Sequence, residues 1–139
     1  MSQINYRDNL IPNPEDVRGL YNDAGWSVYT RDITKLMDGI KGSLYVVTAW
    51  DRKRLVGLIR VVGDGATILY IQDLIVLNSY KRQGIGRNLV HRVREKYSSV
   101  WLTVLLTDDT VETRGFYESL GFKSCDRGEL VSFVKFGHL

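Results

Sequence analysis

The sequence contains few of the residues that build disulfide frameworks and metal centres. Its 139 residues include one cysteine, Cys125, and two histidines, His91 and His138. A single cysteine excludes an internal disulfide and agrees with a reducing compartment. The histidines lie far apart without the spacing of zinc ligands, so the sequence predicts no metal site. We interpret Cys125 as a small packed side chain rather than a nucleophile.

Long apolar runs are also missing. Residues 1–7 lack the apolar core of a signal peptide, and no hydrophobic stretch approaches the length of a membrane span. We therefore expect a cytoplasmic protein with no membrane partner. The composition, 44% hydrophobic and 25% charged residues, is ordinary for a globular protein, and the length predicts one domain over residues 1–139.

The charge is weakly positive and unevenly distributed. A net charge of +3 and a pI near 9.0 agree with several kinds of anionic partner. Cations cluster in residues 81–87 and 91–96, and no basic stripe with interleaved aromatics is present. This pattern favours a small anionic ligand and predicts no nucleic-acid partner.

The most informative stretch is residues 70–97, where a short apolar run gives way to a helical pattern. Residues 74–77 are all apolar strand formers, whereas Ile85, Leu89, Val93 and Tyr97 recur every four residues. The change of period falls at a basic, glycine-containing turn. We therefore expect a strand that leads through this turn into an amphipathic helix.

The turn has the properties of a phosphate-binding cradle. Gly84 and Gly86 allow close approach of the backbone, and the first turn of a helix presents N–H groups without helical partners to an anion. Lys81, Arg82 and Arg87 add positive charge. We interpret this turn as a pyrophosphate cradle; the alternative is a basic helix start whose glycines serve only to turn the chain.

The remaining pattern predicts a single α+β domain with a mixed sheet. Strand 67–77 and strand 100–106 flank a helix, so residues 74–77 and 101–105 should pair in parallel as a right-handed crossover. The second of these strands is nearly all apolar, which is typical of a central strand covered on both faces. The other expected elements are strand 3–7, a helix from Pro14 to about Asp23, a helix capped by Thr30, strands 44–50 and 55–62, a helix from Thr110 to Leu120, and a final hairpin of strands from Phe122 and over 130–136.

Two motifs together resemble a known family. A Rossmann fingerprint would need glycine in place of Leu89, and the Gly-Lys-Ser/Thr of a P-loop is absent. Residues 81–86 instead resemble the acyl-CoA motif of the GNAT acetyltransferases, Arg/Gln-x-x-Gly-x-Gly/Ala, with Lys81 in the first position. Residues 116–122, Phe-Tyr-Glu-Ser-Leu-Gly-Phe, are similar to a second signature of that family. The resemblance covers residues 44–136.

The resemblance implies a GNAT fold and acetyl-CoA as the cofactor. Such a fold has a mostly antiparallel sheet, one parallel strand pair that splays at the acetyl-CoA site, and about four helices. Thr110 and Thr113 stand where family members often have Asn and Ala. The cofactor-binding residues that it implies are Leu74, Ile75, Val76, Lys81, Arg82, Gln83, Gly84, Ile85, Gly86, Arg87, Thr110, Thr113 and Phe116.

The resemblance also implies catalytic groups. Tyr117 would lie near the sulfur and protonate the departing thiolate as a general acid. The amine must lose a proton before it attacks, and Asp73, within an apolar strand, is our first candidate for the base. Asp64 is the second. Alternatively, Asp73 pairs with a cation or caps a β-bulge.

The implied activity is direct transfer of an acetyl group from acetyl-CoA to an amine. The stretch from Gly25 to Asp73 looks like a group of small bacterial GNAT proteins with a distant likeness to plant aralkylamine acetyltransferases. This likeness favours a small primary amine, for example an aryl- or polyamine-like one, with Trp26, Tyr29, Asp64 and Asp73 lining its site. The two aromatics could equally be packing residues. The alternatives are acetylation of a protein lysine or N-terminus, and a CoA-binding module without turnover. Dimers are common in the family, so a homodimer is compatible with the sequence, which indicates no interface.

Overall fold

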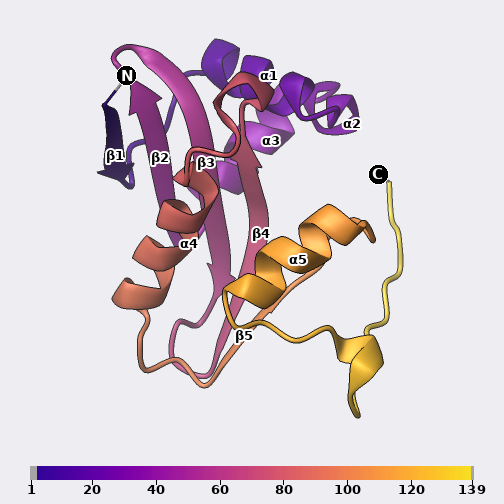
Figure 1. The fold of residues 1–139 in the computed structure, drawn as a ribbon. Coiled ribbons are helices and arrows are strands. Elements are labelled where there is room, and N and C mark those ends of the chain that lie inside the picture. Colours follow the sequence, from indigo (N-terminus) through magenta and orange to yellow (C-terminus); the bar gives the residue numbers. More distant parts are fainter. Residues whose placement is uncertain (1–2, 139) are drawn as a thin grey trace. The chain divides into compact units, whose positions relative to one another are not determined.

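The structure, a computed structural model, describes residues 3–138, which divide into two compact units, the first ending at Leu105 and the second beginning at Leu106. The first unit is built on one five-stranded sheet (Figure 1). The strands lie in the order β1-β2-β3-β4-β5, and only β4 and β5 are parallel. The prediction of a mostly antiparallel sheet with one parallel pair is therefore confirmed. The strands are β1 (Ile4–Asp8), β2 (Tyr45–Asp51), β3 (Arg54–Gly63), β4 (Ile68–Val76) and β5 (Leu102–Leu105).

The helices of this unit are α1 (Pro14–Asp23), α2 (Ser27–Thr30), α3 (Ile33–Lys41) and α4 (Ile85–Lys96). Asn13 caps α1 by accepting a hydrogen bond of 2.9 Å from the Asp16 N–H, as its sequence pattern indicates. The cap of α3 is Asp32, which accepts from the Lys35 N–H. The prediction of Thr30 as this cap was wrong, because its hydroxyl donates to Asn22 Oδ1 instead. No helix in the described residues has the length and apolar character needed to cross a membrane.

Helices cover both faces of the sheet. Gly57 of β3 lies against Ile85 of α4, whereas Arg60 of the same strand lies beside Gly39 of α3. Residues three apart on a strand point to opposite faces, so α4 packs on one face and α3 on the other (Figure 1). The largest fully buried side chains come from both layers: Val17, Leu20, Tyr21, Ile40, Val46, Val47, Val56, Leu58, Ile59, Val61, Leu69 and Leu89.

The parallel pair differs from the prediction in its register and its burial. Residues 68–71 of β4, not 74–77, pair with β5. Strand β5 is also not covered on both faces in its unit: Leu102 is 51% exposed and Trp101, just before the strand, is 82% exposed. The strand itself was predicted correctly, but within the described residues of this unit it is not covered on both faces as predicted.

The second unit contains one α-helix, α5 (Val111–Ser119), and a short 3₁₀ helix, η2 (Cys125–Arg127). Thr110 caps α5 through the Thr113 N–H, and Gly121 ends it with a φ of 92°. The predicted hairpin of strands from Phe122 and over 130–136 is wrong, since no strand is present in residues 122–138. The Arg114 side chain bonds to Asp126 and Ser124, which holds the expected hairpin turn as a 3₁₀ helix against α5.

Gly57 allows α4 to pack closely on the sheet, and this gives a first prediction. A Cβ at this position would lie 3.2 Å from Ile85 Cγ2 and 3.3 Å from both Ala49 Cβ and the Ile75 carbonyl oxygen. We expect Gly57→Ala to lower the free energy of unfolding by about 1–3 kcal/mol through overpacking. Gly19→Ala is the control, because no atom lies within 4 Å of a Cβ in this exposed helical position. Urea denaturation should show a small gain for the control; equal stabilities of the two variants would contradict the packing argument.

Candidate active site

The site starts where β4 loses one of its neighbours. Beyond Ile71, β4 continues to Val76 paired with β3 only, so the backbone of residues 72–76 has no strand neighbour on its β5 side within the described sheet. The β3 pairing also shifts by one residue, because Arg60 faces Asp73 and Val61 faces Ile71. Gln72 is therefore a β-bulge, a feature found often beside active sites. Leu74, Ile75 and Val76, predicted to bind the cofactor, lie on this stretch.

The segment after β4 is held in place by three contacts. The Leu77 N–H donates to the Val56 carbonyl at 2.9 Å, and the Asn78 N–H donates to Asp23 Oδ2 at 2.7 Å. Tyr80 donates through its hydroxyl to the Asp51 carboxylate. The short 3₁₀ helix η1 (Asn78–Tyr80) is thus fastened to α1 and to the β2–β3 turn. It delivers the chain to the basic turn in a fixed position.

The basic turn has the geometry expected of an anion cradle. Arg82 and Gly84 take left-handed conformations, with φ of 65° and 82°, and α4 begins directly afterwards at Ile85. Residues 81–84 are exposed, and no acidic residue lies in the first turn of this 12-residue helix. Helical geometry leaves the N–H groups of that first turn without intrahelical acceptors. Backbone and charge at this turn therefore fit a pyrophosphate.

Two glycines shape the cradle: Gly84 leaves space in it, and Gly57 fixes the position of the helix that follows it. No atom lies within 4 Å of a Cβ built on Gly84, so space is open there. Ile85, in contrast, is buried against Gly57 of β3, which fixes the start of α4 on the sheet. Gly57 was not predicted as a site residue. Its only signal in the sequence is a glycine inside an apolar strand, which often marks a close backbone approach.

Asp73 is occupied in a buried hydrogen-bond network. Its Oδ2 accepts from Arg60 Nε at 2.5 Å and from the Tyr21 hydroxyl at 2.6 Å, and the residue is 2% exposed. Burial raises the pKa of Tyr21 above its ordinary value, and the negative charge of Asp73 raises it further. The geometry thus supports the alternative interpretation of Asp73, pairing with a cation, over that of an accessible base. Arg60 and Tyr21 were not predicted; an arginine inside the apolar run of residues 55–62 was the available signal.

Three aromatic side chains surround this network on the α1–α2 side. Tyr21, Trp26 and Tyr29 pack edge to face, with ring centroids 6.0–6.2 Å apart. Trp26 and Tyr29 are half-buried, so each keeps part of its surface open. Burial and the nearby Asp73 charge raise the pKa of Tyr29. The structure therefore brings Trp26, Tyr29 and Asp73 together through Tyr21.

Asp64 does not join this group. It lies in the β3–β4 turn, at the end of β4 opposite to the basic turn. Its carboxylate accepts from the N–H groups of Ala66, Thr67 and Ile68 and from the Thr67 hydroxyl, which holds its pKa below the usual range. Asp64 caps its own turn, so its predicted place in the amine site and as second base is corrected.

The other predicted site residues lie in the second unit. Thr110 and Thr113 use their hydroxyls within the N-terminal cap of α5, where Thr113 Oγ1 donates to the Asp108 carbonyl at 2.6 Å. Tyr117 packs edge to face with Phe116 and Phe122, at centroid distances of 5.0 and 5.7 Å. Burial raises the pKa of Tyr117 to about 12.

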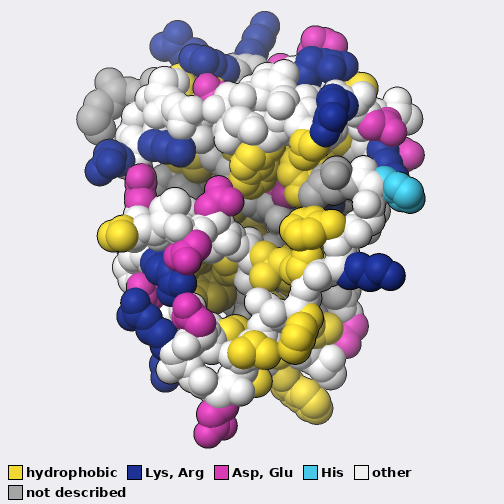
Figure 2. Space-filling model, turned by 90° about the vertical axis from the view of Figure 1, so that its right-hand side faces the viewer, with side chains coloured by type: hydrophobic (Ala, Val, Ile, Leu, Met, Phe, Trp, Pro, Cys, Tyr) yellow, Lys and Arg dark blue, Asp and Glu magenta, His cyan; other side chains and the backbone are white. Residues whose placement is uncertain are grey.

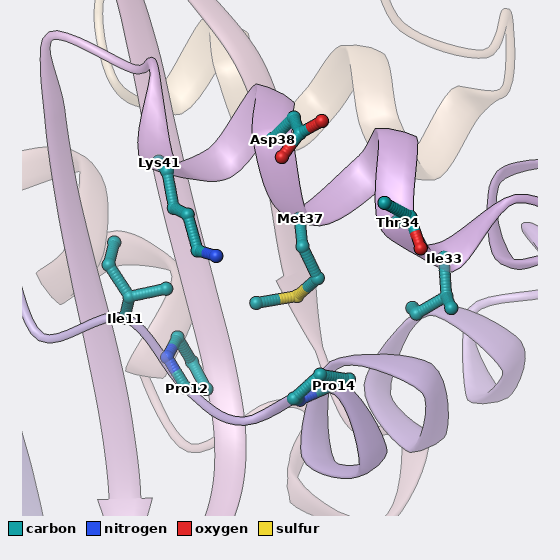
Figure 3. Close-up of a pocket in the computed structure, with 8 residues that line it drawn as sticks. All are labelled: Ile11, Pro12, Pro14, Ile33, Thr34, Met37, Asp38 and Lys41. Atoms are coloured by element: carbon teal, nitrogen blue, oxygen red, sulfur yellow. The ribbon is translucent and has the colours of Figure 1, made fainter.

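A separate hollow of about 410 Å³ lies between α3 and the segment before α1 (Figure 3). Met37 points into it opposite Pro12 and Pro14, and Asp38 and Lys41 stand at its edge. It shares no residue with the cradle or with the aromatic cluster. In the described part of the chain, no group of three metal-ligating side chains lies together.

Comparison with known proteins identifies the family. A family model described as an acetyltransferase (GNAT) domain matches residues 15–136. A solved GNAT family acetyltransferase from Streptococcus pneumoniae TIGR4 is 34% identical, with a TM-score of 0.87 over 97% of this chain and 98% of its own. The chain therefore belongs to the GNAT acetyltransferase family.

More distant relatives extend the comparison. Histone acetyltransferase TAP1 of Glycine max is 27% identical over 126 residues, which cover 81% of this chain and 53% of that protein. The chain spans about half the length of the curated relatives it matches. The aminoglycoside N-acetyltransferase AAC(6')-Iy, solved in complex with CoA, is 17% identical with a TM-score of 0.75 over 98% of this chain and 96% of its own. This last similarity shows the fold alone.

The buried network yields a second prediction. Tyr21→Phe removes one donor to Asp73, and we expect the free energy of unfolding to fall by about 1.5–3 kcal/mol, the range for hydrogen bonds to charged groups. Tyr80→Phe removes a hydrogen bond to an aspartate in a more exposed position and should cost less. Chemical denaturation of both variants at pH 7 measures the two losses of unfolding free energy.

The stability of Tyr21→Phe should also depend on pH differently from that of the wild type. The folded pKa of Tyr21 is raised, so above its unfolded pKa of about 10 the unfolded chain loses this proton first. The stability that it contributes is complete below that pH and falls as the pH rises further. The alkaline loss of stability should be shallower in Tyr21→Phe than in the wild type. An unchanged slope would show that Tyr21 is not the buried donor to Asp73.

Proposed function

We propose that this chain is an N-acetyltransferase that moves the acetyl group of acetyl-CoA directly to the primary amine of a small molecule. The observation that carries the proposal is the open backbone of residues 72–76 leading into the glycine-capped start of α4. A hydrogen-bonding strand edge suits the amides of a pantetheine arm, and the cradle suits a pyrophosphate. Membership of the GNAT family supports the same cofactor.

The residues of this chain would divide the binding of acetyl-CoA between them. Leu74, Ile75 and Val76 would offer backbone groups to the pantetheine arm. The first-turn amides of α4, with Lys81, Arg82 and Arg87 nearby, would hold the phosphates. The family model spans both compact units, which supports our proposal that residues 1–139 act as one domain.

In the reaction, the amine nitrogen attacks the acetyl carbonyl carbon and the carbon–sulfur bond breaks. We assign Tyr117 as the group that protonates the departing thiolate. Its pKa of about 12 keeps the hydroxyl protonated through neutral and mildly alkaline pH. The amine proton leaves to water, because Asp73 already accepts two hydrogen bonds in its buried position. Asp73 acts by positioning Tyr21 within the aromatic cluster.

Trp26 and Tyr29 are the proposed contacts for the amine substrate. Both rings are half-buried and edge to face with Tyr21, so they present apolar and π surface to an aryl or alkyl amine. A second candidate, acetylation of a protein lysine, is favoured by the name of the Glycine max relative. A protein acceptor would have to present its side chain to the same aromatic cluster.

The test is calorimetric titration with acetyl-CoA, followed on the same sample by thiol release with aryl amines, polyamines and lysine peptides. Binding with release by a small amine supports the proposal. Release with peptides alone selects the second candidate, and binding without release from either indicates a CoA-binding module. No binding would refute the assignment of the cradle.

A third prediction concerns the cradle. Gly84→Asp places a carboxylate where the phosphates would lie, and we expect the dissociation constant for acetyl-CoA to rise at least about tenfold. Gly25→Asp is a close control, since Gly25 has a φ of 80° against 82° for Gly84 and neither position has an atom within 4 Å of a built Cβ. Equal weakening by both variants would point to backbone strain rather than charge.

A fourth prediction concerns Tyr117. Tyr117→Phe should lower turnover by roughly a hundredfold or more, because proton donation to the thiolate is lost. Its affinity for acetyl-CoA, measured by calorimetry, should stay within about twofold, since the variant keeps the ring. Tyr97→Phe, at another tyrosine whose pKa burial raises, serves as the control and should keep full turnover. Normal turnover in Tyr117→Phe would remove this hydroxyl from the mechanism.

A further inference from the structure

The hollow between α3 and the segment that precedes α1 has the size and the floor of a small binding site. Its volume, about 410 Å³, lies in the range of small-molecule pockets. The floor is apolar, because Ile11, Pro12, Pro14 and Ile33 surround Met37 there (Figure 3). A methionine side chain is flexible and polarizable, so it adapts its shape to the molecule that packs on it. The hollow therefore suits a ligand with an apolar body.

Two charged side chains stand at the rim of this hollow. Asp38 and Lys41 are three residues apart on α3, a spacing that makes them neighbours on the helix surface. Both are exposed, and neither forms an ion pair or a side-chain hydrogen bond with another residue in the described part of the chain. Figure 3 shows the Lys41 ammonium group extended over the hollow between Ile11 and Met37. One positive and one negative group are therefore available to a bound molecule.

The position of Asp38 is unfavourable for the helix itself. Because α3 ends at Lys41, Asp38 lies in its last turn, where the partial negative charge of the helix terminus disfavours a carboxylate. Figure 2 shows charged side chains of both signs spread over the surface that it draws, so exposure alone does not single out a residue. Asp38 is distinguished by its lack of a pairing cation at this end of the helix and by its place beside an apolar hollow. A ligand cation next to it would offset the unfavourable field of the helix.

We infer that this hollow binds a free apolar amino acid, as a ligand separate from the cofactor and the amine substrate. The α-ammonium group pairs with Asp38, the α-carboxylate pairs with Lys41, and the side chain packs on Met37 and the two prolines. Residues three apart on a helix have Cβ atoms about 5–6 Å apart, which suits two charges carried on one carbon atom. A simple amine or a fatty acid would leave one of the two rim charges without a partner.

The site does not depend on the proposed reaction. All the residues that line the hollow belong to the first compact unit, and none of them belongs to the cradle or to the aromatic cluster. A bound amino acid contacts both α3 and residues 11–14, so it stabilises the folded chain through mass action. Binding can therefore be measured without acetyl-CoA, and a negative result would leave the proposed acetyl transfer untouched.

Nuclear magnetic resonance of the methionine methyl groups tests the inference. The chain has two methionines, Met1 and Met37, so labelling these methyl groups with carbon-13 gives one probe on the floor of the hollow. Met37→Leu identifies its signal. Titration with unlabelled leucine, methionine or phenylalanine should shift that signal and reach saturation. A Met37 signal that none of the three amino acids moves would overturn the inference.

Charge variants and ligand analogues test the orientation in the same titration. Lys41→Met should raise the dissociation constant for leucine at least about tenfold but leave that for leucinamide, which lacks the carboxylate, within about twofold. Asp38→Asn should likewise weaken leucine but not N-acetylleucine, which lacks the ammonium group. Lys35→Met is the matched control, because Lys35 is an exposed lysine of α3 outside the hollow. Equal weakening by Lys35→Met, or equal losses for leucine and leucinamide in Lys41→Met, would contradict the assigned site.

Discussion

The Asp73 carboxylate, buried between the Arg60 guanidinium and the Tyr21 hydroxyl, is the interaction on which the first unit depends. It joins strands β3 and β4 to α1 in a region with almost no exposed surface. A buried charge without a partner is costly, so each member of this network requires the others. Because Arg60 faces Asp73 directly across the sheet, the ion pair also fixes the register beside the Gln72 bulge. The residues of β4 that follow Asp73 are therefore positioned by this ion pair.

Two consequences follow for the site. Past the bulge, β4 has a neighbour on one side only, and its last residues lead straight into η1 and the cradle. On the other face of the sheet, Gly57 lets the first residue of α4 approach closely, which places the amides of the helix start near the end of β4. In the proposed binding mode, the strand edge and the helix terminus offer hydrogen-bond donors to one extended ligand, while the buried ion pair keeps its own charge away from solvent.

Sequence reasoning succeeded where structure is determined locally. The caps at Asn13 and Thr110, the glycine turn before α4 and the strand periods depend on residues within one or two turns of each other. It could not choose between two interpretations of Asp73, because the partners Arg60 and Tyr21 lie 13 and 52 residues away. The Asp64 prediction failed because residue type alone does not distinguish an aspartate that caps a turn from an active-site acid. In place of the predicted hairpin turn there is a short 3₁₀ helix, whose Asp126 is bonded to Arg114, twelve residues away in the sequence.

The second unit poses a different physical problem. It holds the proposed acid Tyr117, which is half-buried, yet none of its described residues is fully buried, and Val111, Phe133 and Phe136 are largely exposed. A unit of this size cannot bury enough surface to be stable by itself. Its apolar surface must be covered by a larger body of protein. The position of the Tyr117 hydroxyl is then set by the surface that covers it.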